Sequence, residues 1–101
     1  MTPVLVTGAG GYLGARVVRL LTDAGTDAVG VARADGDLTD REAARRLVAA
    51  MPWRAVVHAA AAVPRATAEY EAPRMRANAE MARALVDALG ALSRPPLLVA
   101  I

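Results

Sequence analysis

A glycine-rich turn close to the N-terminus constrains the fold of this chain more than any other stretch of its sequence. The uncharged run Val4-Leu5-Val6 has the composition of a buried parallel strand, and glycines follow at positions 8, 11 and 14. Residues 15–21 then carry the apolar spacing of a helix. A strand, a glycine turn and a helix in this order bring unpaired backbone N–H groups close to an anion. We therefore predict a dinucleotide phosphate site, although the same glycines would also suit a tight turn without a ligand.

The spacing of the glycines indicates which kind of phosphate site to expect. The dinucleotide pattern G-x-G-x-x-G fails because Leu13 replaces its last glycine, and a P-loop fails because the chain has no lysine. The spacing T-G-x-x-G-x-x-G does fit. It resembles the turn of extended short-chain dehydrogenases/reductases, the branch of that family that modifies sugar nucleotides. The resemblance implies that the cofactor is bound by Thr7, Gly8, Gly11, Tyr12, Leu13 and Gly14.

Composition bounds the size and the partners of the protein. A chain of 101 residues makes one small domain, expected here to be an NAD(P)-binding domain over residues 1–101 that is incomplete at its C-terminus. The net charge is +2, and the arginines are scattered among ten acidic residues, so no nucleic-acid partner is expected. The absence of cysteine excludes disulfides and thiolate metal sites. No apolar run approaches the ~20 residues that span a membrane, and we expect a cytoplasmic protein with no membrane partner.

The segment after the turn predicts a βαβ unit. The helix is expected to run from about Gly11 to Ala24 and to end at Gly25, where a left-handed residue commonly ends a helix. Residues 27–32 are then expected to form a second strand parallel to the first. Because ligands bind at the carboxyl ends of parallel strands, the glycine turn would lie at the ligand-binding edge of the sheet.

The residues after the second strand bear on the choice of cofactor. Enzymes that prefer NAD usually have an Asp or Glu there, about 20 residues beyond the glycines, which binds the ribose hydroxyls. This chain has Ala32 and Arg33 instead, and a guanidinium can pair with a 2′-phosphate. These residues favour NADP(H) over NAD(H). The alternative is that Arg33 is an ordinary exposed arginine and that Asp35 binds the ribose.

No helix fits between the second strand and the segment Gly36 to Asp40. This direct passage resembles dTDP-dehydrorhamnose reductases and their relatives, and the resemblance implies that Asp37 and Leu38 contact the adenine. A capping box formed by Thr39 and Glu42 is expected to begin a helix over residues 40–51, and it would explain part of the pattern without a ligand.

The third expected strand, residues 53–59, leads into a row of alanines. His58-Ala59-Ala60 resembles the Asn- or His-Ala-Ala segment of extended family members. The resemblance implies that Ala59, Ala60 and Ala61 let the cofactor's ribose and pyrophosphate pass close to the backbone. His58 is the only histidine, and no Ser or Asp spacing supports a catalytic triad. We therefore expect it to be a hydrogen-bonded strand residue.

The last third of the chain predicts a connection over residues 63–73, a helix over residues 74–89 closed by Gly90, and a strand over residues 97–101. By resemblance, Asn78 in this helix supports the active site. The helix is expected to pack on the sheet through the apolar positions Met75, Ala79, Ala82, Leu85, Val86 and Leu89.

Together these patterns predict an α/β fold, a doubly wound, mostly parallel Rossmann-type sheet of about five strands. The resemblance implies the cofactor-binding first part of an NAD(P)-dependent reductase, epimerase or dehydratase that acts on a sugar nucleotide or a similar carbonyl compound. The family's catalytic Ser or Thr and its Tyr-x-x-x-Lys are absent; Tyr70 is followed four residues later by Arg74, which cannot replace the lysine. Whether the chain is an enzyme stays open, and alone it is expected to be inactive and to self-associate through an exposed sheet edge. The alternatives are a redox-sensing binding module and a truncated, nonfunctional reading frame.

Overall fold

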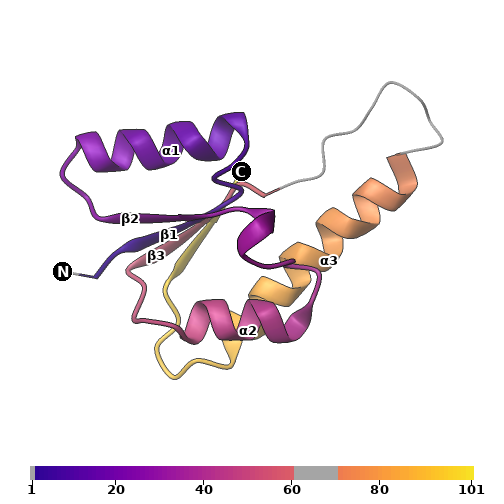
Figure 1. The fold of residues 1–101 in the computed structure, drawn as a ribbon. Coiled ribbons are helices and arrows are strands. Elements are labelled where there is room, and N and C mark those ends of the chain that lie inside the picture. Colours follow the sequence, from indigo (N-terminus) through magenta and orange to yellow (C-terminus); the bar gives the residue numbers. More distant parts are fainter. Residues whose placement is uncertain (1, 61–70) are drawn as a thin grey trace.

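The computed structural model describes residues 2–60 and 71–101, which alternate between strands and helices (Figure 1). A single 3₁₀ turn stands where a doubly wound fold commonly has a helix after its second strand. The elements are β1 (Val4–Thr7), α1 (Tyr12–Asp23), β2 (Ala28–Val31), the 3₁₀ turn η1 (Arg33–Asp35), α2 (Arg41–Ala49), β3 (Ala55–His58), α3 (Glu71–Gly90) and β4 (Leu97–Ala100).

The strands form one parallel sheet in the order β2-β1-β3-β4. The described residues contain four strands, whereas about five were expected from the sequence. The chain moves from β1 to β2 on one side of β1 and then crosses to β3 on the other side. Because parallel crossovers are right-handed, this reversal puts α1 on one face of the sheet and both α2 and α3 on the opposite face (Figure 1). A crevice for a ligand is expected where the direction reverses, between the carboxyl ends of β1 and β3.

The main core lies between the sheet and the pair α2–α3. Leu5 and Val56 point into it from the central strands, and Val48 of α2 and Leu85 of α3 cover them. The indole of Trp53 is also buried there, and its Nε1 donates a hydrogen bond to the carbonyl of Leu47 at 3.1 Å. Burial of these large apolar side chains is the main favourable contribution to the stability of such a small domain.

The buried face of α3 is only partly the expected one. Leu85 and Leu89 are buried as expected, but Met75 and Val86 are 64% and 54% exposed, and Ala79 and Ala82 are exposed as well. The residues that complete the buried face are Ala84 and Ala88. Small alanines let α3 approach α2 closely, and in an alanine-rich helix they do not mark one face in the sequence.

Local hydrogen bonding explains the helix ends. Gly25 follows α1 with φ +81, as predicted for a left-handed C-terminal residue. The predicted capping box at the start of α2 is wrong. The N-cap is Asp40, whose side chain accepts a hydrogen bond from the N–H of Glu42, while Thr39 donates both its N–H and its hydroxyl to Asp37. The carboxylate of Asp37 competes for the threonine hydroxyl because it is a strong, ionised acceptor.

The outer edge of β4 is the most exposed part of the sheet. Among the described strands β4 pairs only with β3, and its side chains Leu97 and Val99 are 68% and 42% exposed. Ile101, directly after the strand, is 63% exposed. An unpaired strand edge with apolar side chains and no charge favours association with another chain.

We therefore predict that the 101-residue chain self-associates through β4. Sedimentation velocity should show a sedimentation coefficient that rises with protein concentration. Val99→Lys should suppress the rise, because it adds a charge to the edge strand. Val86→Lys is the matched control, since Val86 is exposed on α3, away from this edge. A monomer at all concentrations would contradict the role assigned to the edge.

Candidate functional site

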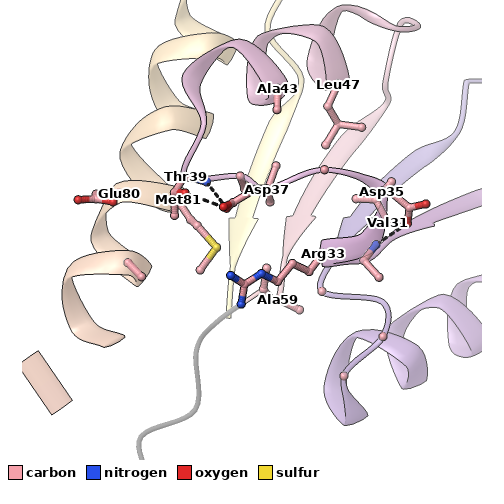
Figure 2. A pocket seen from close by; sticks show the side chains of 18 of the residues that line it. Val31, Arg33, Asp35, Asp37, Thr39, Ala43, Leu47, Ala59, Glu80 and Met81 are labelled. Carbon is pink, nitrogen blue, oxygen red and sulfur yellow. Dashed lines mark hydrogen bonds between the residues drawn. The ribbon is translucent and has the colours of Figure 1, made fainter. Parts of the chain in front are cut away.

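A cavity of about 870 Å³ lies at the carboxyl ends of β1, β2 and β3, at the crevice expected from the topology (Figure 2). Five segments contribute to it: the glycine turn, the segment after β2, α2, the end of β3 and α3. Its lining residues are Gly8, Gly10, Gly11, Val31, Ala32, Arg33, Asp35, Gly36, Asp37, Leu38, Thr39, Ala43, Arg46, Leu47, Ala59, Ala60, Ala77, Glu80 and Met81.

The first glycine of the turn lets β1 and β3 approach each other. Gly8 has φ +71, and a Cβ atom there would lie 2.6 Å from the amide nitrogen of Ala60 and 2.7 Å from the carbonyl carbon of Ala59. Any larger residue would therefore push the turn away from the end of β3. On its other side the turn is tied to β2, because the N–H of Ala9 donates to the carbonyl of Val31 at 3.0 Å.

The second and third glycines have different roles. A Cβ on Gly14 would overlap the carbonyl of Gly8, so this buried glycine lets α1 pack on its own turn. A Cβ on Gly11 would meet only the Gly8 oxygen, at 3.4 Å, which is an ordinary van der Waals contact. Gly11 also lines the cavity. The protein itself therefore leaves room for a side chain at Gly11, whereas a ligand passing close to the backbone would not.

The first turn of α1 faces the cavity without a side-chain cap. Its N-cap is Gly11, and the turn contains no acidic residue. The first N–H groups of such a helix have no intrahelical partner, and the helix dipole favours an anion next to them. Tyr12 and Leu13 are exposed, and neither lines the cavity. The Tyr12 hydroxyl instead accepts a hydrogen bond from Arg16, whose guanidinium lies 5.6 Å from the ring centroid. The structure therefore places the side chains of these two predicted site residues outside the cavity lining.

Arg33 and Asp35, the two residues considered for binding the ribose, point in different directions. Figure 2 shows the Arg33 side chain extending toward Ala59 and the interior of the cavity. Asp35 is turned back toward the end of β2, where its Oδ2 accepts a hydrogen bond from the N–H of Ala32 at 2.8 Å (Figure 2). Asp35 therefore has a structural partner within its own turn, while Arg33 carries its charge into the cavity.

The segment after η1 supplies an ionised carboxylate next to an apolar surface. The N–H and hydroxyl of Thr39 donate to Asp37 at 3.0 and 2.8 Å. These bonds hold the pKa of Asp37 below its usual value; the nearby charge of Arg33 lowers it further, and partial desolvation opposes both. Leu38 is 8% exposed and packs into the core while it also lines the cavity.

The far side of the cavity was not predicted from the sequence. Ala43, Arg46 and Leu47 come from α2, and Ala77, Glu80 and Met81 come from α3. Within each set the residues are about one helical turn apart, and this spacing in the sequence indicates that they share one face of their helix. Which turn of that face borders the cavity depends on how α2 packs on α3. Asn78 is half-buried on α3 and does not line the cavity.

Among the predicted site residues, the structure brings seven together around the cavity: Gly8, Gly11, Arg33, Asp37, Leu38, Ala59 and Ala60. Thr7 is fully buried behind it. The hydroxyl of Thr7 lies 2.7 Å from His58 Nδ1, which confirms that His58 is a hydrogen-bonded strand residue. Ala61, as well as Tyr70, lies outside the described residues.

A metal-binding cluster and a membrane-spanning helix are both absent from the part of the chain that the structure describes. Residues 2–60 and 71–101 contain no group of three or more acidic or histidine side chains that could hold a metal ion. None of the described helices is both long enough and apolar enough to cross a membrane.

Solved structures resemble this fold closely. A GDP-6-OMe-4-keto-L-xylo-heptose reductase from C. jejuni superposes with a TM-score of 0.84 at 17% identity, over 98% of this chain and 29% of that chain. A UDP-glucose 4-epimerase from Thermus thermophilus in complex with NAD gives 0.76 at 22% identity, over 86% and 33%. A GDP-L-fucose synthetase from Naegleria fowleri bound to NADP gives 0.71 at 22% identity, over 86% and 27%. The chain thus spans about a third or less of the length of these three proteins.

No curated protein sequence matches the chain. Residues 4–100 match the family described as the NAD dependent epimerase/dehydratase family, and this range includes the glycine turn, the sheet and both helical layers. The four-stranded parallel sheet and its glycine turn agree with that match. The chain therefore belongs to the NAD dependent epimerase/dehydratase family.

Proposed function

We propose that residues 1–101 bind NADP(H) as the cofactor-binding part of a longer reductase, epimerase or dehydratase that acts on a sugar nucleotide or a similar carbonyl compound. The observation that carries the proposal is the glycine turn at the crevice between β1 and β3. There Gly11 leaves the backbone open to a ligand, next to the uncapped start of α1. Solved relatives of this fold are complexes with NAD and with NADP.

The residues around the cavity suit the parts of a dinucleotide. A pyrophosphate is favoured at the first turn of α1, where the backbone N–H groups of Tyr12 and Leu13 would face it. Ala59 and Ala60 leave room beside the turn for a ribose, and we assign the same role to Ala61. Asp37 and Leu38 offer an acceptor and an apolar surface to the adenine. Asn78 and Thr7 line no part of the cavity, and we assign them a supporting role behind it.

The preference for NADP(H) rests on Arg33. Its guanidinium extends into the cavity, and the neighbouring Ala32 supplies no carboxylate that would repel a 2′-phosphate. Asp35, the acidic alternative, already accepts a hydrogen bond from the backbone of its own turn. The solved relatives include both an NAD and an NADP complex and so favour neither cofactor. The proposed preference for NADP(H) therefore rests on this chain's own residues.

The share of these 101 residues in the reaction is to bind and orient the cofactor. When bound, the nicotinamide would exchange a hydride with a substrate carbon. The 101 residues contain no lysine and therefore no Tyr-x-x-x-Lys pair for the accompanying proton transfer. The same observation favours a second candidate function, a binding module that senses the redox state of the cofactor without catalysis. Turnover of a sugar nucleotide by this chain alone would exclude the second candidate.

Gly11→Val tests the phosphate-binding turn. The new side chain should occupy the path of the pyrophosphate, so NADP(H) affinity measured by calorimetry should fall at least about tenfold, or about 1.4 kcal/mol. The unfolding midpoint should change little, because the protein leaves space at this position. Gly90→Val is the matched control, since a Cβ on Gly90 meets no atom within 4 Å. Unchanged affinity of Gly11→Val would refute the assignment of the turn.

Arg33→Ala tests the cofactor preference. Loss of a charged hydrogen bond should remove about 1.5–3 kcal/mol of NADP(H) binding free energy and leave NAD(H) binding nearly unchanged. Titration of both cofactors measures the ratio directly. Arg94→Ala, which removes an exposed arginine outside the cavity, should leave the ratio as it is. If the wild type prefers NAD(H) and Arg33→Ala has no effect, Asp35 is the ribose-binding residue.

A further inference from the structure

Behind the cavity, three groups converge on one buried hydroxyl. Thr7 at the end of β1 is 0% exposed and stands opposite His58 in the parallel register of β1 and β3. Its Oγ1 lies 2.7 Å from His58 Nδ1. The same oxygen accepts hydrogen bonds from the N–H groups of Ala59 at 3.1 Å and Ala60 at 3.2 Å. We call Thr7, His58, Ala59 and Ala60 the hydroxyl cluster.

The number of donors and acceptors at the Thr7 hydroxyl determines which atoms of this cluster carry protons. A threonine hydroxyl has one proton and two lone pairs. Both lone pairs accept backbone N–H groups from Ala59 and Ala60, so the proton of Thr7 is donated to His58. Nδ1 of His58 must therefore be an acceptor without a proton, and the neutral ring carries its proton on Nε2.

The cluster fixes the backbone that borders the cavity. Ala59 and Ala60 line the cavity, and their backbone occupies the space that a side chain on Gly8 would need. Thr7 directly precedes Gly8, so a single hydroxyl joins the glycine turn to the end of β3. The carbonyl of His58 accepts a further hydrogen bond from the N–H of Ile101 at 3.1 Å, which ties the end of β3 to β4 as well. Neither Thr7 nor His58 lines the cavity.

We propose that Thr7 and His58 are positioning residues, which hold the glycine turn against Ala59 and Ala60 only while His58 is neutral, so that protonation of His58 loosens the cavity and weakens cofactor binding. The part about the cofactor rests on the proposed function; the proton arrangement does not. A protonated ring would direct an Nδ1–H at the Thr7 oxygen. That oxygen cannot accept three donors with two lone pairs. At least one of the two alanine N–H groups then loses its partner, and the Thr7 proton loses its acceptor.

The surroundings of His58 supply little to stabilise a positive charge. The residues next to it on β1 and β4, Thr7 and Ala100, are uncharged. In the part of the chain that the structure describes, the charged groups that line the cavity are Arg33, Asp35, Asp37, Arg46 on α2 and Glu80 on α3. Burial of the ring lowers the pKa of His58.

The lowered pKa of His58 determines how the stability of the hydroxyl cluster depends on pH. An unfolded or loosened chain binds the proton with the ordinary histidine pKa of about 6.5, whereas the intact cluster binds it less readily. The cluster is therefore fully stable above about pH 6.5 and loses stability as the pH falls from there toward the lowered pKa.

Nitrogen-15 NMR of the imidazole tests the proton arrangement without any cofactor. Because His58 is the only histidine in the chain, its two ring nitrogens give unambiguous signals. At pH 7.5 we expect an unprotonated Nδ1, a protonated Nε2 and a midpoint below that of the unfolded chain in denaturant. Equal tautomer populations, a protonated Nδ1 or an ordinary midpoint would overturn the proposal.

His58→Asn tests the link to the cofactor. An asparagine carbonyl can accept the Thr7 proton but cannot titrate, whereas His58→Leu removes the acceptor altogether. NADP(H) affinity is measured from pH 8 to 5.5 for all three proteins. The 2′-phosphate itself titrates near pH 6, so the ratio of wild type to His58→Asn isolates the histidine. We expect the wild type to lose up to about tenfold more affinity than His58→Asn at pH 5.5, one unit below the ordinary pKa, and His58→Leu to bind weakly at every pH.

The outcomes separate the two proposals. Parallel pH profiles of the wild type and His58→Asn would overturn the positioning role even if NADP(H) binds. No binding by the wild type at any pH would overturn the proposed function, and the NMR result would then decide the proton arrangement by itself. If His58→Asn fails to fold, Thr7→Ser, which keeps the hydroxyl, should retain the tautomer and midpoint of the wild type, whereas Thr7→Val should lose both. An unchanged histidine signal in Thr7→Val would overturn the proposal.

Discussion

The close contact between the glycine turn and the end of β3 is the constraint on which the rest of the site depends. Gly8 can touch the backbone of Ala59 and Ala60 only because it has no side chain and adopts a positive φ. Gly14 in turn lets α1 pack on the carbonyl of Gly8. Strand end, turn and helix start are therefore one packed unit, and small changes in it would alter the crevice where ligands of parallel sheets bind.

The charges around the cavity divide it into two regions. The start of α1 and the guanidinium of Arg33 make the side near the turn favourable for phosphate groups. On the side of α2 and α3, the carboxylates of Asp37 and Glu80 accompany the guanidinium of Arg46, and the hydrogen bonds from Thr39 keep Asp37 ionised. An ionised carboxylate repels phosphate and accepts hydrogen bonds from a base. For the proposed dinucleotide, electrostatics as well as shape would favour one orientation.

The two faces of the sheet differ in how well they are covered. On the face of α2 and α3, Leu5, Val56 and Leu85 form a continuous buried core. On the other face α1 covers β1 and β2, and among the residues of this helix only Gly14 is buried. β3 and β4 extend beyond this helix, which leaves apolar side chains of β4 exposed. The buried core therefore lies mainly on one face, whereas the other face offers a surface for association.

The sequence by itself determined the parts of the protein that depend on neighbouring residues. The short apolar strands, the spacing of Gly8, Gly11 and Gly14, and the left-handed Gly25 are local features, and they sufficed to predict a doubly wound parallel sheet, in which the turn borders a cavity. They also indicated that no helix fits between the second strand and Gly36, where the structure has only the short 3₁₀ turn η1. These features are readable because a turn or a helix end is fixed by the conformational freedom of a few consecutive residues.

Only the tertiary structure decided the rest. Which face of α3 is buried depends on its packing against α2, and alanines on both faces hide that choice in the sequence. The cap of α2 was decided by competition, because the carboxylate of Asp37 takes the hydroxyl of Thr39. The partnership of Thr7 and His58, 51 residues apart, exists only because β1 and β3 are neighbours in the sheet. Such contacts are long-range, and their energies depend on which groups the fold brings together, so no local pattern records them.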